Sequence, residues 1–185
     1  MRHRPIFLVD VDDVLADLST KVKVLLSGIL DREWKFEEMA PEDWYLFSDL
    51  AEHHRSQAQS AFSDYNWVWS IEPLPGAQDA VKELRGMADV YVVTASVDWA
   101  PVRIQWLKEH FDFEKHELVF TESKHLVDGD FFLDDHPGNV CKWQKFRPHG
   151  WSILWESPVN SHLDVWVPNR VSRWESVFEM VKNST

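Results

Sequence analysis

The chain is poor in the residue types that cross-link small folds, form flexible linkers or cross membranes. It has one cysteine, six glycines and nine prolines in 185 residues. Cys141 therefore cannot form an internal disulfide, and it lacks the Cys/His spacing of a zinc site. No apolar stretch approaches the ~18 residues of a membrane helix, and no glycine-rich phosphate loop is present. We expect a protein of a reducing, cytoplasmic setting without membrane contact.

Basic side chains are also scarce. Lysine and arginine total 19 against 31 aspartates and glutamates, which gives a formal charge of −12, and the basic residues form no run. Nucleic acid polymers and anionic membranes bind basic surfaces, so we expect neither as a partner. A small phosphorylated substrate is compatible with this charge, because a bound divalent cation can reverse the local field.

Length and composition predict a globular chain with one main domain. Hydrophobic residues make up 44% of the sequence and charged residues 27%, both near globular averages. Domains usually have ~100–200 residues, so this length allows at most a small insertion. Eleven tryptophans are unusual for 185 residues, and they predict aromatic packing in the core or around a pocket.

Short apolar runs that end in polar residues alternate with helix-like stretches along most of the chain. The runs are typical of buried parallel strands: Ile6–Val11, Val90–Thr94, Phe131–Asp134 and Trp151–Trp155. The helix-like stretches are Ala77–Met87, Pro101–His110, Pro137–Phe146 and Arg173–Lys182. Strands that alternate with helices predict an α/β fold with a doubly wound, mainly parallel sheet.

Residues 17–72 break this rhythm, since they are rich in Glu, Trp, Phe and His and contain no convincing strand. We interpret them as a small helical cap inserted after the first strand, with Pro73-Leu-Pro-Gly76 returning the chain to the sheet. The predicted domains are thus a core of residues 1–16 and 73–185 and a cap of residues 17–72. Ligands of open α/β sheets bind at the carboxyl ends of the strands, where this cap would cover them.

Acidic and hydroxyl side chains follow the predicted strands at that edge. Asp10 and Asp12 leave the first strand at alternate positions, and Asp134-Asp135 end another. Paired carboxylates of this kind suit Mg²⁺, which also accepts substrate phosphate as a ligand. Thr94 offers a hydroxyl and neighbouring N–H groups to a phosphoryl oxygen, and Lys124 offers a positive charge. Together they supply what phosphoryl transfer through an aspartyl-phosphate requires.

The order of these residues resembles the haloacid dehalogenase (HAD) superfamily of phosphohydrolases, whose core is Rossmann-like. Four segments are similar, within it, to the 5′(3′)-deoxyribonucleotidases: Asp10-Val-Asp-Asp-Val-Leu-Ala-Asp17, Glu72-Pro-Leu-Pro-Gly-Ala77, Thr121-Glu-Ser-Lys124 and Leu133-Asp-Asp-His-Pro137. The resemblance covers residues 6–157, and the combination in this order is specific, although Asp-x-Asp alone is not.

The resemblance implies roles for the acids. Asp10 would be the nucleophile and Asp12 the general acid/base. Asp10, the main-chain carbonyl of Asp12 and Asp134 would bind Mg²⁺, and Asp135 would support these ligands.

The resemblance also implies how the substrate binds. Thr94, the Ala95 N–H, Lys124 and Arg103 would hold the phosphate, and three aromatic residues of the cap would contact a base: Trp44, Tyr45 and Phe62. Two positions depart from the family pattern, because Asp13 stands where glycine is common and Ala95 where serine often occurs. These departures bear on substrate preference more than on reaction type.

We therefore expect a Mg²⁺-dependent phosphomonoesterase for (deoxy)nucleoside monophosphates. Two alternatives stay open: a HAD phosphatase for another small phosphate ester, and a catalytically silent binding protein with the same fold. The presence of both Asp10 and Asp12 argues against a silent protein, since binding alone does not need the second acid. Base preference, the position of the phosphate and a homodimer are also left open.

Overall fold

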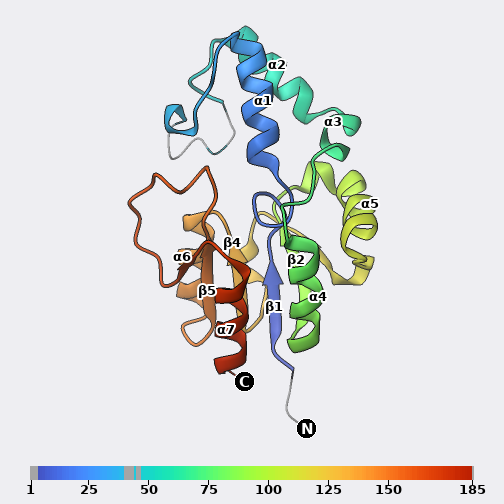
Figure 1. Ribbon diagram of the computed structural model, residues 1–185, viewed down its shortest axis with the longest axis vertical. Coiled ribbons are helices and arrows are strands. Elements are labelled where there is room, and N and C mark those ends of the chain that lie inside the picture. Colours follow the sequence, from blue (N-terminus) through green and yellow to red (C-terminus); the bar gives the residue numbers. More distant parts are fainter. Residues whose placement is uncertain (1–3, 40–43, 45–46, 185) are drawn as a thin grey trace.

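A six-stranded sheet, in which every pair of neighbouring strands is parallel, forms the centre of the computed structural model (Figure 1). The structure describes residues 4–39, 44 and 47–184. The strands are β1 (Ile6–Val9), β2 (Asp89–Thr94), β3 (Leu118–Phe120), β4 (Phe131–Asp134), β5 (Trp151–Trp155) and β6 (Arg170–Val171). Their order, β3-β2-β1-β4-β5-β6, is that of a doubly wound sheet and confirms the predicted fold class.

Helices cover both faces of the sheet because successive strand residues point to opposite sides. Phe7 and Val9 of β1 belong to the larger buried cluster, whereas Leu8 belongs to a smaller one on the other face. Helices α4 (Ala77–Met87) and α7 (Trp174–Ser184) lie side by side over the first face (Figure 1).

Two further helices complete these layers. Helix α5 (Ala100–Phe111) contributes Trp106 and Leu107 to the larger cluster. Helix α6 (Pro137–Phe146) packs on the second face, where the ring of Trp143 stacks on that of Phe132 with 5.4 Å between the ring centroids. No helix in the described part of the chain is both long and apolar enough to cross a membrane.

The predicted strands and helices of the core are present, with shifted ends in some cases. The first strand ends at Val9 rather than Val11, because the main-chain oxygen of Val11 accepts hydrogen bonds from Leu15 and Ala16, both at 2.8 Å, in a loop. Strands β3 and β6 were not predicted, since runs of three and two residues are too short to show a pattern.

The segment between β1 and α4 is largely helical and lies over the carboxyl ends of the central strands (Figure 1). It contains α1 (Leu18–Leu30), α2 (Glu52–Phe62) and α3 (Tyr65–Trp69) before α4 begins. Asp17 caps α1, where its side chain accepts a hydrogen bond from the Thr20 N–H, and Asp64 caps α3 in the same way. The described residues of 17–72 form no strand.

Both ends of this segment meet above β1. The Asp17 N–H donates to the oxygen of Glu72, and the Leu74 N–H donates to the oxygen of Leu15, each at 2.8 Å. The two connections therefore run antiparallel beside each other. The division into a core and a cap at residues 17 and 72 stays a prediction.

Candidate active site

The tips of β1 and β4 bring two of the predicted acids together. These strands are neighbours at the point where the strand order reverses, which is the usual ligand position in open α/β sheets. The Asp10 N–H donates to the oxygen of Leu133 at 2.9 Å, so Asp10 leaves the sheet directly beside Asp134.

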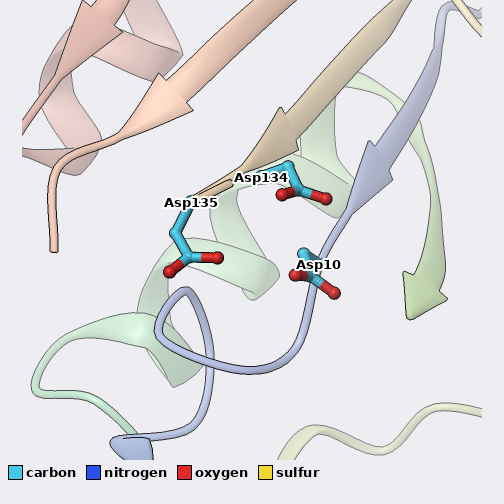
Figure 2. A group of neighbouring side chains, drawn as sticks. All are labelled: Asp10, Asp134 and Asp135. Atoms are coloured by element: carbon cyan, nitrogen blue, oxygen red, sulfur yellow. The ribbon is translucent and has the colours of Figure 1, made fainter. Parts of the chain in front are cut away.

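Three buried carboxylates form a group at this edge. Asp10, Asp134 and Asp135 each offer an oxygen within 4.8 Å of the others. Figure 2 shows Asp10 at the end of β1 and the other two acids at the end of β4. A set of oxygen donors alone is what hard cations such as Mg²⁺ prefer. Asp12 lies outside this group, and its predicted metal contact is through its main-chain carbonyl.

Lys124 partly balances the charge of these acids. Its Nζ lies 2.7 Å from Asp10 Oδ1 and 2.7 Å from Asp134 Oδ2, and the side chain is almost fully buried. Burial opposes the charged ammonium, but the two carboxylates outweigh this effect and raise the pKa of Lys124. One ammonium therefore faces three acids, which leaves an excess of negative charge.

The pKa values of two of these acids are raised. Burial, reinforced by Asp134 and Asp12 and opposed by Lys124, raises the pKa of Asp10 from 3.8 to about 7. Burial also raises the pKa of Asp135, and the charges of Asp13, Asp134 and Asp10 add to the effect. A divalent cation at this position would remove the repulsion that opposes ionisation of these groups.

Polar groups that were not predicted hold Asp134 and Asp135 in place. Asp134 Oδ1 accepts from the His136 N–H at 2.8 Å and from Asn139 Nδ2 at 3.2 Å. Ser157 Oγ donates to Asp135 Oδ2 at 3.3 Å. The sequence gives little signal for these partners, because Ser157 comes from the loop after another strand.

The loop after β1 depends on Asp13. This residue has a φ of 57°, in the left-handed region, which explains why glycine is common at this position. Its Oδ1 accepts hydrogen bonds from the N–H (2.7 Å) and Oγ (2.6 Å) of Ser19 at the start of α1. The carboxylate thus fixes the turn to the helix, and aspartate tolerates this backbone conformation better than most residues.

Asp12 is held by a different set of side chains. Ser96 Oγ donates to Asp12 Oδ2 at 2.5 Å, and Arg103 Nη2 donates to Asp12 Oδ1. Thr94 Oγ1 lies 3.2 Å from Ser96 Oγ and accepts from the Ser96 N–H at 3.2 Å. Ser96, which was not among the predicted site residues, therefore links Thr94 at the tip of β2 to the predicted general acid/base.

A cavity of about 750 Å³ opens above these residues. Asp10, Asp12, Thr94, Ala95 and Lys124 all line it, and Ala95 is exposed to solvent. The cavity thus contacts the predicted catalytic and phosphate-binding positions with one exception. Arg103 has no exposed surface and does not line the cavity.

Aromatic side chains of residues 17–72 form the opposite wall. Trp44 lies 4.3 Å from the ring of His136, measured between ring centroids, and Phe62 lies 5.3 Å from the rings of both Phe47 and Trp99. All of these residues line the cavity. The third predicted base-contacting residue, Tyr45, lies outside the described residues.

The fold is similar to that of solved HAD-like hydrolases. A HAD-like hydrolase from Bacillus subtilis, described as bound to magnesium, is 12% identical with a TM-score of 0.63, and the match covers 98% of this chain and 100% of that one. At this identity the likeness shows the fold alone.

Sequence comparison narrows the class to one family. The profile described as 5′ nucleotidase, deoxy (pyrimidine), cytosolic type C protein matches residues 4–184, so the chain belongs to this family. The 5′(3′)-deoxyribonucleotidase of Bacillus subtilis is 25% identical over 94% of this chain and 96% of that protein. The mitochondrial 5′(3′)-deoxyribonucleotidase of Mus musculus is 29% identical over 96% of this chain and 84% of that protein. The predicted resemblance is confirmed, and the chain is a deoxyribonucleotidase-like hydrolase.

Proposed function

We propose that this protein is a Mg²⁺-dependent phosphomonoesterase that hydrolyses (deoxy)nucleoside monophosphates through an aspartyl-phosphate on Asp10. The observation that carries the proposal is the cavity. Asp10, Asp135 and Lys124 line its floor, Asp134 lies buried beside them, and aromatic side chains of the segment above the sheet line its wall. The names of the relatives, which are 5′(3′)-deoxyribonucleotidases, support the same substrate class.

Asp10 and Asp12 would share the chemistry. An oxygen of Asp10 attacks phosphorus, and Asp12 gives a proton to the ester oxygen as its bond to phosphorus breaks. Asp12 then takes a proton from the water that attacks the phosphoryl group and restores the Asp10 carboxylate. Lys124 stabilises the charge on the phosphoryl oxygens, with help from Thr94 and Ala95.

The donor set fits the implied metal. Asp10, Asp134 and Asp135 are the side chains that would hold Mg²⁺, because their oxygens lie close together. Burial and the charges of neighbouring acids raise the pKa values of Asp10 and Asp135, and a cation would favour their ionised forms. When bound, the ion would neutralise phosphate charge and orient the phosphoryl group for in-line attack. The two acids that do not receive phosphate are kept in position by Asn139 and Ser157.

The test compares two substrates that differ only in the base. Thymidine 5′-monophosphate and 2-deoxyribose 5-phosphate share the sugar phosphate, so the ratio of their kcat/KM values measures what the base contributes. We expect phosphate release from both to require Mg²⁺ and to favour the nucleotide by at least about tenfold, since stacking of one base contributes about 1–3 kcal/mol. Equal kcat/KM values would instead favour a general phosphatase for small phosphate esters.

A stability measurement locates the metal. Mg²⁺ at about 100 times its Kd should stabilise the protein by about 2.7 kcal/mol, which corresponds to a rise in Tm of about 5–10 °C for a chain of this size. We expect Asp135→Asn to lose this rise, because it removes one of the three carboxylates of the proposed metal site. Without metal the variant should melt at or above the wild-type Tm, since a buried like charge is gone.

The control for this measurement is Asp98→Asn. Asp98 is an exposed acid that lines the same cavity but lies outside the three-acid group. This variant should keep the full Mg²⁺-dependent rise in Tm. A rise that survives in Asp135→Asn, or that disappears equally in Asp98→Asn, would contradict the proposed metal position.

The aromatic wall gives a prediction about specificity. Phe62→Leu keeps an apolar side chain among Phe47, Trp67 and Trp99 but removes the flat ring. We expect kcat/KM for thymidine 5′-monophosphate to fall by about tenfold, and that for 2-deoxyribose 5-phosphate to change by less than about twofold.

Phe178→Leu serves as the matched control, because Phe178 is a buried ring of α7 that does not line the cavity. Phe178→Leu should leave the ratio of the kcat/KM values for the two substrates unchanged. If Phe62→Leu lowers kcat/KM for both substrates in the same proportion, Phe62 acts in packing and the proposed base contact is wrong.

A further inference from the structure

The side chain of Arg103 is buried behind Asp12 and does not reach the cavity in which a phosphate would bind. It has no exposed surface, whereas the carboxylate of Asp12 is 18% exposed and lines the cavity. Nη2 of Arg103 donates to Asp12 Oδ1. Nε and Nη1 are buried and have no hydrogen-bond partner among the residues that the structure describes. In this arrangement the guanidinium lies behind the acid, on the side away from the cavity.

Two tryptophans hold the guanidinium in this position. The centre of the guanidinium lies 5.2 Å from the ring of Trp99 and 5.3 Å from that of Trp106, which are cation–π distances. Both rings are themselves fixed, because Trp99 Nε1 donates to the oxygen of Phe62 at 2.6 Å and Trp106 Nε1 donates to the oxygen of Ile71 at 2.8 Å.

Burying Arg103 between two tryptophans and beside Asp12 is a poor way to gain stability. A buried charge with two nitrogen donors that lack a partner among the described residues costs free energy, and replacing a buried ion pair by apolar side chains is often neutral or stabilising. Arginine is nevertheless suited to one task here, since it stays charged and its planar group keeps a fixed geometry toward a carboxylate. The cost is understandable if that geometry is needed at Asp12.

The two hydrogen-bond partners of Asp12, Arg103 and Ser96, also differ in whether they can accept a hydrogen bond from it. A guanidinium has donors only, so the oxygen that faces it, Oδ1, cannot present a proton to it. The hydroxyl of Ser96, which bonds Oδ2, can both donate and accept. The carboxylate is thus oriented so that Oδ2 is the oxygen that can carry a proton.

We propose that Arg103 is a positioning residue that orients Asp12 for proton transfer and does not bind the substrate phosphate. The proposal rests on the function proposed above. In the first step the ester oxygen takes the proton of Asp12 as its bond to phosphorus breaks and the bond from Asp10 to phosphorus forms. In the second step Asp12 takes a proton from water as the water oxygen bonds to phosphorus and the Asp10 carboxylate leaves. Arg103 forms and breaks no covalent bond in either step.

The test uses two substrates with different leaving groups. The leaving group of thymidine 5′-monophosphate is an alkoxide, which needs a proton. The leaving group of p-nitrophenyl phosphate is a stable phenolate, which does not. We expect Arg103→Met to lower kcat for the nucleotide by about a hundredfold, as loss of general acid catalysis does. The first-turnover burst of p-nitrophenolate and the inhibition constant of inorganic phosphate should change by less than about threefold.

Three further variants make the result decisive. Arg103→Lys should recover part of the nucleotide rate, because a lysine also donates to Asp12 Oδ1, and it serves in place of Arg103→Met if that variant does not fold. Arg85→Met is the matched control, since Arg85 lies 4.3 Å above the ring of Phe113 and bonds the oxygen of Phe111, away from the cavity. Arg85→Met should leave kcat for the nucleotide and the p-nitrophenolate burst unchanged.

The third variant, Asp12→Asn, separates the two proposals. If it lowers hydrolysis of the nucleotide and the p-nitrophenolate burst alike, the acid/base role of Asp12 fails, and the function proposed above fails with it. If Asp12→Asn shows the leaving-group dependence but the Arg103 variants do not, only the positioning role is wrong. A weaker inhibition by inorganic phosphate in Arg103→Met, with equal losses on both substrates, would instead show that Arg103 binds phosphate.

Discussion

Asp10→Asn should lower kcat for thymidine 5′-monophosphate by roughly a thousandfold or more, about 4 kcal/mol of activation free energy. The amide is nearly isosteric with the carboxylate, but it is a poor nucleophile and a weaker metal ligand. It can still accept from Lys124 Nζ, which lies 2.7 Å from Asp10 Oδ1. The fold should therefore persist, and neutralising a buried carboxyl whose pKa is already raised should cost little stability.

Two measurements check this result. Acid-quenched wild-type protein should carry one phosphoryl group by mass spectrometry during turnover, and the variant should carry none. Asp130→Asn is the matched control, because Asp130 accepts a hydrogen bond from the Ile6 N–H at the opposite end of β1 and an amide can replace it. If Asp10→Asn keeps more than about a tenth of wild-type kcat, catalysis through this residue is excluded.

Lys124→Met should have the second-largest effect, on both activity and stability. It removes the ammonium between Asp10 and Asp134 and leaves two buried acids without their cation. Removing one partner of a buried ion pair typically costs about 3–5 kcal/mol, and we expect metal-free unfolding to show a loss of this order. We also expect kcat to fall by about a hundredfold or more even with Mg²⁺, because a stabilising charge on the phosphoryl group is missing.

The pH dependence of stability distinguishes this role from simple packing. A carboxyl whose pKa is raised on folding stabilises the folded state below its unfolded pKa and loses that contribution as pH rises through the folded pKa. For metal-free wild type, this window for Asp10 runs from 3.8 to about 7. Lys124 lowers the pKa of Asp10, so its removal raises that pKa further and extends the loss to higher pH. In the presence of chelator, the Tm of Lys124→Met should keep falling above neutral pH relative to wild type.

Lys108→Met is the control for this prediction. Lys108 also lies between two acids, Asp112 at 2.5 Å and Glu114 at 2.8 Å, but its side chain is half exposed. Exposed pairs contribute little, so this variant should have nearly wild-type activity and stability. If Lys124→Met and Lys108→Met behaved alike at every pH, the buried ion pairs of Lys124 would be unimportant.

The core of the fold was predictable where the local pattern was strong. Helices Ala77–Met87 and Pro137–Phe146 begin and end at the predicted residues, since a glycine or a proline marks each start. The edge strands β3 and β6 were missed because they are short, and their pairing with β2 and β5 is decided by neighbours far along the chain. Tertiary context, rather than propensity, forms such strands.

In the candidate site, too, the residues at strand ends were predictable, whereas their partners from distant parts of the chain were not. The position of Asp10, Thr94 and Asp134 after strands was enough to predict that they meet, because parallel strands end at one edge. The partners of these residues were not predictable in this way. Asp12 and Arg103 are 91 residues apart, and nothing local indicates that the arginine would be buried between two tryptophans.

The adjoining ends of residues 17–72 have a consequence for how such proteins diversify. Because hydrogen bonds join Asp17 to Glu72 and Leu74 to Leu15, the whole segment leaves and rejoins the sheet at one point. A segment attached in this way can be shortened, lengthened or exchanged without moving the strands that carry Asp10 and Asp134. Recombination at this junction would change which molecules are accepted while it leaves the reaction intact, so substrate range and chemistry can evolve as separate modules.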